Sequence, residues 1–107
     1  MSVWLIEGDE LRVRVPEGGE AEARRFYGEV LGLEGPAGHG VQLAFDIEVP
    51  FRPVEELAAL VVADLEALLE RLAEHGVRPD GGEQLGFFER VYVRDPFGNR
   101  LALLAER

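Results

Sequence analysis

Three arginines and a tyrosine are the residues of this sequence best suited to hold a ligand. Arg12 and Arg14 lie two residues apart in one segment, and Arg90 lies far along the chain beside Tyr92. A guanidinium group presents a planar fork of donors that holds a carboxylate or phosphate through paired, charge-assisted hydrogen bonds. Tyr92 adds an aromatic ring and a phenolic hydroxyl. These residue types predict a site for a small anion with an aromatic part.

The composition excludes several other kinds of chemistry. The 107 residues include no Cys, Lys or Thr and a single Ser, Ser2, which excludes thiol nucleophiles, Schiff-base lysines and Walker-type phosphate loops. Two His residues cannot make a three-His zinc site. The net charge of −10 argues against nucleic acid as the main partner. No apolar run suits a membrane span and the first residues lack the basic region of a signal peptide, so we expect a cytoplasmic protein.

Hydrophobic periodicity predicts a strand, a helix and a second strand in the first half of the chain. Leu11, Val13 and Val15 alternate with arginines, as in a half-buried strand, and residues 41–47 alternate again. Between these segments, apolar residues fall at helical spacing over residues 20–31.

The second half repeats this order. The apolar run 57–63 predicts a strand, and Asp64 suits the N-cap of a helix that reaches residue 75. Gly32 and Gly76 are each placed to end a helix in the left-handed conformation. Residues 89–94 and 101–104 are then expected as strands around a turn at 95–99.

The repeated order indicates two similar halves that share a core. We expect one domain over residues 1–107, with half-modules at about 10–48 and 55–105 and the first half shortened. Val3–Ile6 is expected to add one further strand, which would protect an open sheet margin.

Two segments of the chain resemble the vicinal-oxygen-chelate superfamily, which includes glyoxalase I, bleomycin-resistance proteins and extradiol dioxygenases. The segments are Ala23–Leu33, ARRFYGEVLGL, and Val91–Leu101, VYVRDPFGNRL. The resemblance implies an α+β fold in which two βαβββ-type modules form a curved mixed sheet around a cleft, with the helices on its outer face.

Catalytic members of that superfamily hold a divalent metal through four His or Glu ligands. The resemblance places the four positions at Glu10, at or near Ala44, at or near Ala58, and at Ala102. Alanine has no donor atom, so we expect no metal, no cofactor and no catalytic residue. The alternative is a Glu10–His39–Asp46 metal site, which needs the loop around His39 to fold inward.

Strand alternation assigns the residues that face the cleft. If the apolar side chains of the first strand pack under the helix, their polar neighbours point the other way, and the same holds for the strands at 41–47 and 89–94. The alternative is that the arginines form only cross-strand ion pairs. The candidate ligand-binding residues are Glu10, Arg12, Arg14, Gln42, Asp46, Arg90 and Tyr92.

The function that best fits these observations is binding of a small molecule without a metal and without catalysis. The resemblance to bleomycin-resistance proteins implies a homodimer that binds its ligand in the cleft without a metal. One alternative is a metal-dependent lyase, isomerase or dioxygenase of the glyoxalase type. Another is an interaction module that binds no ligand. The arginines favour an anionic ligand.

Overall fold

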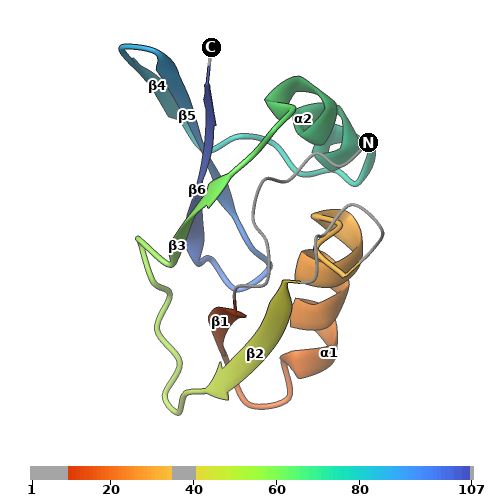
Figure 1. Cartoon of the computed structure of the whole chain (residues 1–107). Helices are drawn as coiled ribbons and strands as arrows, with labels where there is room; N and C mark the ends of the chain where they lie inside the picture. Colours follow the sequence, from red (N-terminus) through yellow and green to blue (C-terminus); the bar gives the residue numbers. More distant parts are fainter. Residues whose placement is uncertain (1–9, 35–40, 107) are drawn as a thin grey trace.

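The computed structural model describes residues 10–34 and 41–106, in which six strands form two sheets (Figure 1). The α+β class predicted from the sequence is therefore confirmed. In chain order the elements are β1 (Glu10–Val15), α1 (Glu20–Arg24), the π-helix η1 (Arg25–Val30), β2 (Gln42–Ile47), β3 (Ala58–Val61), α2 (Leu65–Glu74), β4 (Gly82–Leu85), β5 (Phe88–Arg94) and β6 (Arg100–Glu106).

The two sheets repeat one pairing. β1 and β2 are parallel, and so are β3 and β6, with a helix between the partners in the chain. In the second half, β5 and β4 continue the sheet in the order β3-β6-β5-β4, which gives the predicted β-α-β-β-β sequence of elements. The described part of the first half holds two strands only. The strand predicted at Val3–Ile6 lies outside the described residues.

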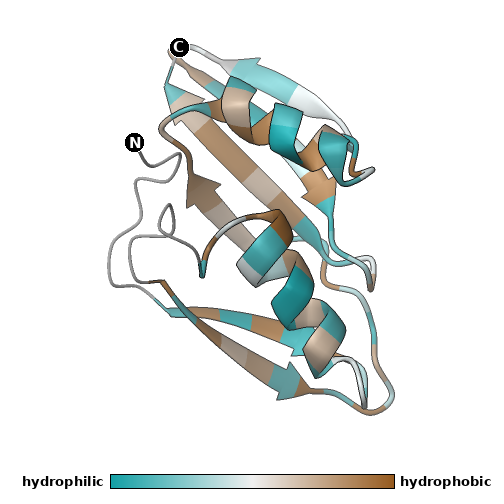
Figure 2. Cartoon of the chain, turned by 90° about the vertical axis from the view of Figure 1, so that its right-hand side faces the viewer, coloured by the Kyte–Doolittle hydropathy of each residue, from teal (hydrophilic) through white to brown (hydrophobic). Residues whose placement is uncertain are grey.

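Both helices lie on the same side of the sheets (Figures 1 and 2). This arrangement follows from strands with one apolar face: β1 alternates exposed and buried residues, and its buried residues belong to the core. The same core takes in the buried leucines of α2 and the inward residues of β5 and β6. The opposite side of each sheet carries most of the polar side chains of the strands, and it is the side on which the sequence predicts the ligand.

The first helical segment covers the predicted range but changes type within it. The α-helix ends at Arg24, and a π-helix follows in which the Leu31 amide donates to the Phe26 carbonyl at 2.8 Å. The wider turn buries Phe26, Tyr27 and Gly28 together, although three consecutive residues cannot share one face of an α-helix. Periodicity alone therefore located this segment without indicating its geometry.

The ends of α2 are those that the sequence predicts. The Asp64 carboxylate accepts a hydrogen bond from the Ala67 amide at 3.0 Å, as an N-cap does. At the other end, Gly76 has a φ of +76°, and the Val77 amide donates to the Leu72 carbonyl at 2.8 Å. This is a Schellman motif, in which glycine adopts the left-handed conformation without steric strain.

A buried polar network joins the two halves. The Tyr27 hydroxyl donates to Asp95 Oδ2 at 2.6 Å, and Asn99 Nδ2 donates to the same oxygen at 2.8 Å. Asn99 also donates to the Arg14 carbonyl at 2.9 Å and accepts from the Val54 amide at 2.8 Å. The turn at 95–99 thus holds the helical segment, β1 and the connector between the halves in one arrangement.

A second link between the halves comes from α2. Arg71 donates from Nε to the Val30 carbonyl at 2.9 Å and from Nη2 to the Glu29 carbonyl at 2.6 Å. A cation is favourable at the end of a helical segment, where carbonyl groups lack partners. Among the described residues, no helix is both long and apolar enough to cross a membrane.

Candidate functional site

The side of the four-stranded sheet that faces away from the helices carries a cavity of about 360 Å³. Alternation along β5 turns its buried valines toward the helices and turns Arg90 and Tyr92 toward this cavity. In the strand register, Tyr92 pairs with Ala102 on β6, and Ala102 pairs with Ala59 on β3. We call this the Arg90–Tyr92 cavity. It is lined by Glu55, Glu56, Ala58, Ala59, Arg90, Tyr92, Arg100 and Ala102.

Tyr92 is held by contacts to its hydroxyl group and to its ring. Its hydroxyl accepts a hydrogen bond from Arg90 Nη1 at 3.4 Å and donates one to Glu83 Oε1 at 3.0 Å. The guanidinium carbon of Arg100 lies 3.8 Å from the centre of the ring, a cation–π contact. The aromatic wall of the cavity is therefore bracketed by two arginines.

Both arginines keep a buried donor without a hydrogen bond. Arg90 Nε and Arg100 Nε have no hydrogen-bond partner within the described part of the chain. Arg100 Nε lies 3.5 Å from Asp80 Oδ2, which is ion-pair distance, but the geometry is not that of a hydrogen bond. A buried donor left unpaired costs about 1–3 kcal/mol, so such groups are usually satisfied by ordered water or a ligand.

The acidic residues of the cavity differ in their pairing. Glu55 accepts two hydrogen bonds from Arg94, at 3.3 and 3.2 Å, and Arg94 also donates to Asp80 at 2.7 Å. The hydrogen bonds to Glu55 and Asp80 raise the pKa of Arg94. Glu56 forms no ion pair with any residue that the structure describes. One of the two glutamates is thus already neutralised by an arginine outside the cavity.

The predicted residues of the first sheet form a separate, exposed cluster. Arg12 donates to Asp46 from Nε at 3.1 Å and from Nη2 at 2.6 Å, and its Nη1 lies 2.8 Å from Glu10 Oε1. The bidentate pair lowers the pKa of Asp46 and raises that of Arg12. Arg14 lies 3.4 Å from Glu48. Arg12 thus forms the cross-strand ion pair with Asp46 that the sequence analysis considers, whereas the partner of Arg14 is Glu48, just after β2.

The structure brings only part of the predicted set together. Arg90 and Tyr92 line the Arg90–Tyr92 cavity. Glu10 lines a second cavity of about 320 Å³, which shares Ala58 and Ala59 with the first. The remaining four candidates line neither cavity and lie on the first sheet: Arg12, Arg14, Gln42 and Asp46.

The residues at the superfamily's metal positions do not fit a metal ion. Ala58 and Ala102 line the Arg90–Tyr92 cavity, so two of these positions lie where a cleft ligand would be, but neither side chain has a donor atom. Ala44 pairs in register with Arg12 on the first sheet and also lacks a donor atom. Within residues 10–34 and 41–106, no cluster of three or more His, Cys, Asp or Glu side chains could hold a metal. His39 lies outside the described residues.

Sequence reasoning missed Arg100 and both glutamates of the cavity. The sequence predicts the last strand from Leu101, but β6 begins one residue earlier, and Arg100 then pairs in register with Arg94. The signal was available, because Arg100 alternates with the buried Leu101. Glu55 and Glu56 lie in the connector before β3, where no periodicity indicates the direction of a side chain.

The chain belongs to a protein superfamily defined by this fold. Residues 35–103, well over half of the sequence, match the Glyoxalase/Bleomycin resistance protein/Dioxygenase superfamily. The superfamily predicted from the two sequence segments is thereby confirmed. A comparison with curated proteins finds no match.

Solved structures of this superfamily share the fold along nearly the whole chain. A glyoxalase family protein from Bacillus anthracis is 26% identical, with a TM-score of 0.74 and all of both chains covered. TnmS3, an antibiotic binding protein from Streptomyces sp. CB03234, is 23% identical, with a TM-score of 0.69 over 96% of this chain and 98% of that one. The oxidase ChaP-H2 is 22% identical, with a TM-score of 0.66 over 96% and 95%. At these identities the last two show a common fold.

Proposed function

We propose that this protein binds a small molecule in the Arg90–Tyr92 cavity, without a metal and without catalysing a reaction. The observation that carries the proposal is the cavity itself, of about 360 Å³, which combines small apolar side chains with two arginines and one aromatic ring. Small-molecule sites commonly have such a composition, with a few polar groups set among apolar ones. TnmS3, whose fold is similar, is an antibiotic binding protein, which is consistent with a binding role.

The ligand that suits the cavity is a small, partly aromatic anion. The guanidinium group of Arg90 contacts the Tyr92 hydroxyl and that of Arg100 lies over the Tyr92 ring, and each retains a buried donor without a hydrogen bond. A carboxylate could take hydrogen bonds from this pair while its ring packs on the methyl groups of Ala59 and Ala102. Glu55 opposes an anion only weakly, because it is paired with Arg94, and the charge of Glu56 is outweighed by the two arginines of the cavity.

The absence of a metal is proposed from the donor set. Binding a divalent ion tightly takes several oxygen or nitrogen ligands, and the described superfamily positions offer mainly methyl groups. Elemental analysis of protein purified without an affinity tag is expected to find far less than one equivalent of zinc, nickel, iron or manganese. One equivalent that survives dialysis would favour the glyoxalase-type enzyme instead.

We further propose that the whole chain acts as one domain and forms a homodimer in the cytoplasm. The buried network of Tyr27, Asp95 and Asn99 supports the single domain, because it joins the two halves. Exposed apolar side chains near the end of β2, Ile47 at 53% and Val49 at 71%, support a partner surface there. Sedimentation velocity at two protein concentrations measures the oligomeric state directly.

The ligand proposal is tested with three probes that share one ring. These are 4-hydroxyphenylacetate, its neutral amide and the cation tyramine. Only the carboxylate is expected to raise the melting temperature, since a ligand that binds the native state stabilises it by mass action. Arg90→Ala should remove the response, whereas Arg25→Ala deletes an equal charge outside the cavity and should retain it. Stabilisation by tyramine, or an unchanged response in Arg90→Ala, would show that the ligand class is wrong.

A further inference from the structure

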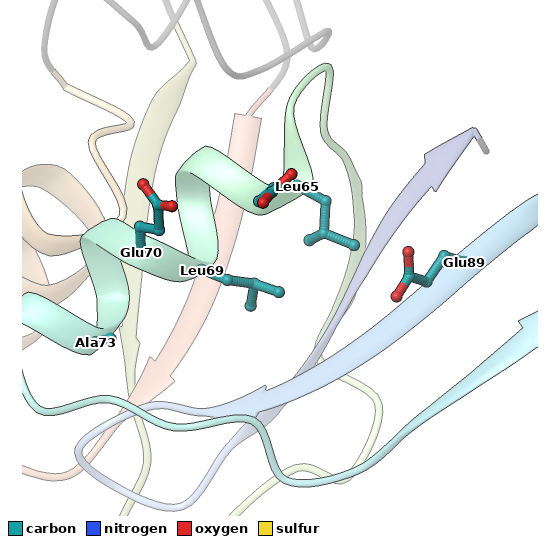
Figure 3. Close-up of a pocket in the computed structure, with 6 residues that line it drawn as sticks. Leu65, Leu69, Glu70, Ala73 and Glu89 are labelled. Carbon is teal, nitrogen blue, oxygen red and sulfur yellow. The ribbon is translucent and has the colours of Figure 1, made fainter.

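A second depression lies on the helix side of the four-stranded sheet, opposite the Arg90–Tyr92 cavity (Figure 3). It is a groove of about 520 Å³ between α2 and β5. Leu65 and Leu69 extend from α2 into the space before β5, and the carboxylate of Glu89 lies on the strand opposite them. We call it the α2 groove. It is lined by Leu65, Glu66, Leu69, Glu70, Ala73 and Glu89.

The groove edge of α2 is built from two adjacent rows of side chains. Leu65, Leu69 and Ala73 are spaced four residues apart and form an apolar row beside the core-facing residues of the helix. Leu65 is buried in the core, whereas Leu69 is only partly buried and Ala73 is exposed, so the accessible part of this row lies at Leu69 and Ala73. Rows of this spacing are the ridges through which helices pack against one another.

The second row is acidic and lies one residue further along. Glu66 and Glu70 are exposed on the groove rim, and Glu89 faces them from β5. None of these three carboxylates forms an ion pair with a residue in the described parts of the chain, although most arginines there are paired. An apolar strip with unpaired acidic groups on both sides is complementary to an apolar strip bordered by cations.

We propose that the α2 groove binds a basic amphipathic helix of another protein. The apolar face of such a helix would lie on Leu69 and Ala73, with the buried Leu65 at the floor of the groove, and its lysines or arginines would reach the carboxylates on either rim. Helix-in-groove recognition uses this arrangement, with apolar anchors at successive turns. The ten residues of α2 span about 15 Å, which accommodates two to three turns of a partner helix.

The charges of the groove favour this partner over a second copy of the chain. Pairing α2 with α2 of another copy would place the row of Glu66 and Glu70 near an identical row, and like charges in such positions repel. The occupant must therefore supply positive charge along a helical face. This inference is independent of the small-molecule site, because the two depressions lie on opposite sides of the sheet.

Fluorescence anisotropy with a labelled synthetic helix tests the proposal. The probe is an amphipathic peptide of leucine and lysine, with leucines at i, i+3, i+4 and i+7, and the comparison peptide has the same composition in scrambled order. The ordered peptide is expected to bind more tightly, because only it presents an apolar stripe. Equal binding of the two peptides would show mere attraction to an acidic protein and would overturn the proposal.

Two matched double variants locate the binding. Glu66→Gln/Glu70→Gln removes two rim charges and should weaken binding of the ordered peptide roughly fivefold, the scale of two exposed ion pairs. Glu17→Gln/Glu22→Gln removes the same charge from exposed positions outside the groove and should change it less than about twofold by the same scale. Equal losses in the two variants would place the peptide elsewhere. Circular dichroism confirms that both variants remain folded.

Discussion

Replacing Tyr27 by Phe tests the buried network that joins the two halves. The substitution keeps the ring, which packs edge-to-face on Phe26 at 5.0 Å between centroids, and removes only the hydroxyl. That hydroxyl is fully buried and donates to Asp95 Oδ2 at 2.6 Å. Asp95 retains its other donors, which are the side-chain and backbone NH groups of Asn99 and the amide of Phe97.

The expected effect near neutral pH is a loss of about 2 kcal/mol in the free energy of unfolding. Hydrogen bonds to charged groups contribute about 1.5–3 kcal/mol, and the lower part of this range applies because Asp95 remains hydrogen-bonded. The ring change itself should contribute little, because the volume and the packing are retained.

The same residue makes stability depend on alkaline pH. Burial, and secondarily the nearby Asp95 carboxylate, raise the pKa of Tyr27 above its ordinary value near 10. A group whose pKa is raised in the folded state contributes its full stability below the unfolded pKa and loses it as pH rises. Above about pH 10 the wild type should therefore lose about 1.4 kcal/mol per pH unit relative to Tyr27→Phe.

The composition makes this loss measurable. The chain has no Lys and no Cys, and its arginines remain charged up to about pH 12. Tyrosines therefore dominate the titration of side chains at alkaline pH. Tyr92 is common to both proteins and cancels in the difference. Near neutral pH the free energy of unfolding of Tyr27→Phe is expected to be about 2 kcal/mol lower than that of the wild type, and the two should become equal at about pH 11.5. Urea unfolding at a series of pH values measures this crossing, and a difference that stays constant to pH 12 would refute the assignment.

Three further substitutions have defined outcomes. Asn99→Ala removes three side-chain hydrogen bonds of a fully buried residue and should lower the free energy of unfolding by about 3 kcal/mol in urea melts. Asp46→Asn should make the free energy of unfolding depend less on pH below about pH 4. Arg12 lowers the pKa of Asp46 in the folded protein, and the stabilisation from this pair is lost as the pH falls through that lowered pKa. Gly32→Ala should lower thermal stability by about 1 kcal/mol, since Gly32 has a φ of +79°.

Local patterns located most of the elements. Alternation found β1, β2 and β5, and capping residues found both ends of α2, because these signals depend on neighbours within a few residues. β4 was missed because its four residues, GEQL, show no clear apolar alternation. It forms by pairing with β5, where Glu83 lies opposite Arg90, and this is information from another strand.

In the candidate site, too, the sequence predicts the side to which a residue points but not the residue with which it forms an ion pair. Alternation predicts the side to which Arg12 points, but its partner depends on how β1 and β2 are aligned. In the observed register Arg12 lies opposite Ala44. The small alanine leaves room for the guanidinium to reach Asp46, two residues further along the neighbouring strand. Arg14, opposite Asp46, pairs with Glu48 instead. Such choices are set by tertiary geometry and cannot be read from the spacing of residues in one strand.

Tyr92, Ala102 and Ala59 form a row across three strands. This row shows that the chain keeps a metal position of the superfamily in place but carries a side chain there that cannot bind a metal. The superfamily resemblance locates Ala102 near the cleft, and the register places it between a tyrosine and a second alanine. Histidine or glutamate side chains at such positions would direct their polar atoms at one point and could bind a cation there. Methyl groups offer no polar atom, and the polar groups beside Tyr92 are the guanidinium groups of two arginines. This difference in side-chain chemistry is the basis of the proposal that the cavity holds a molecule without activating it.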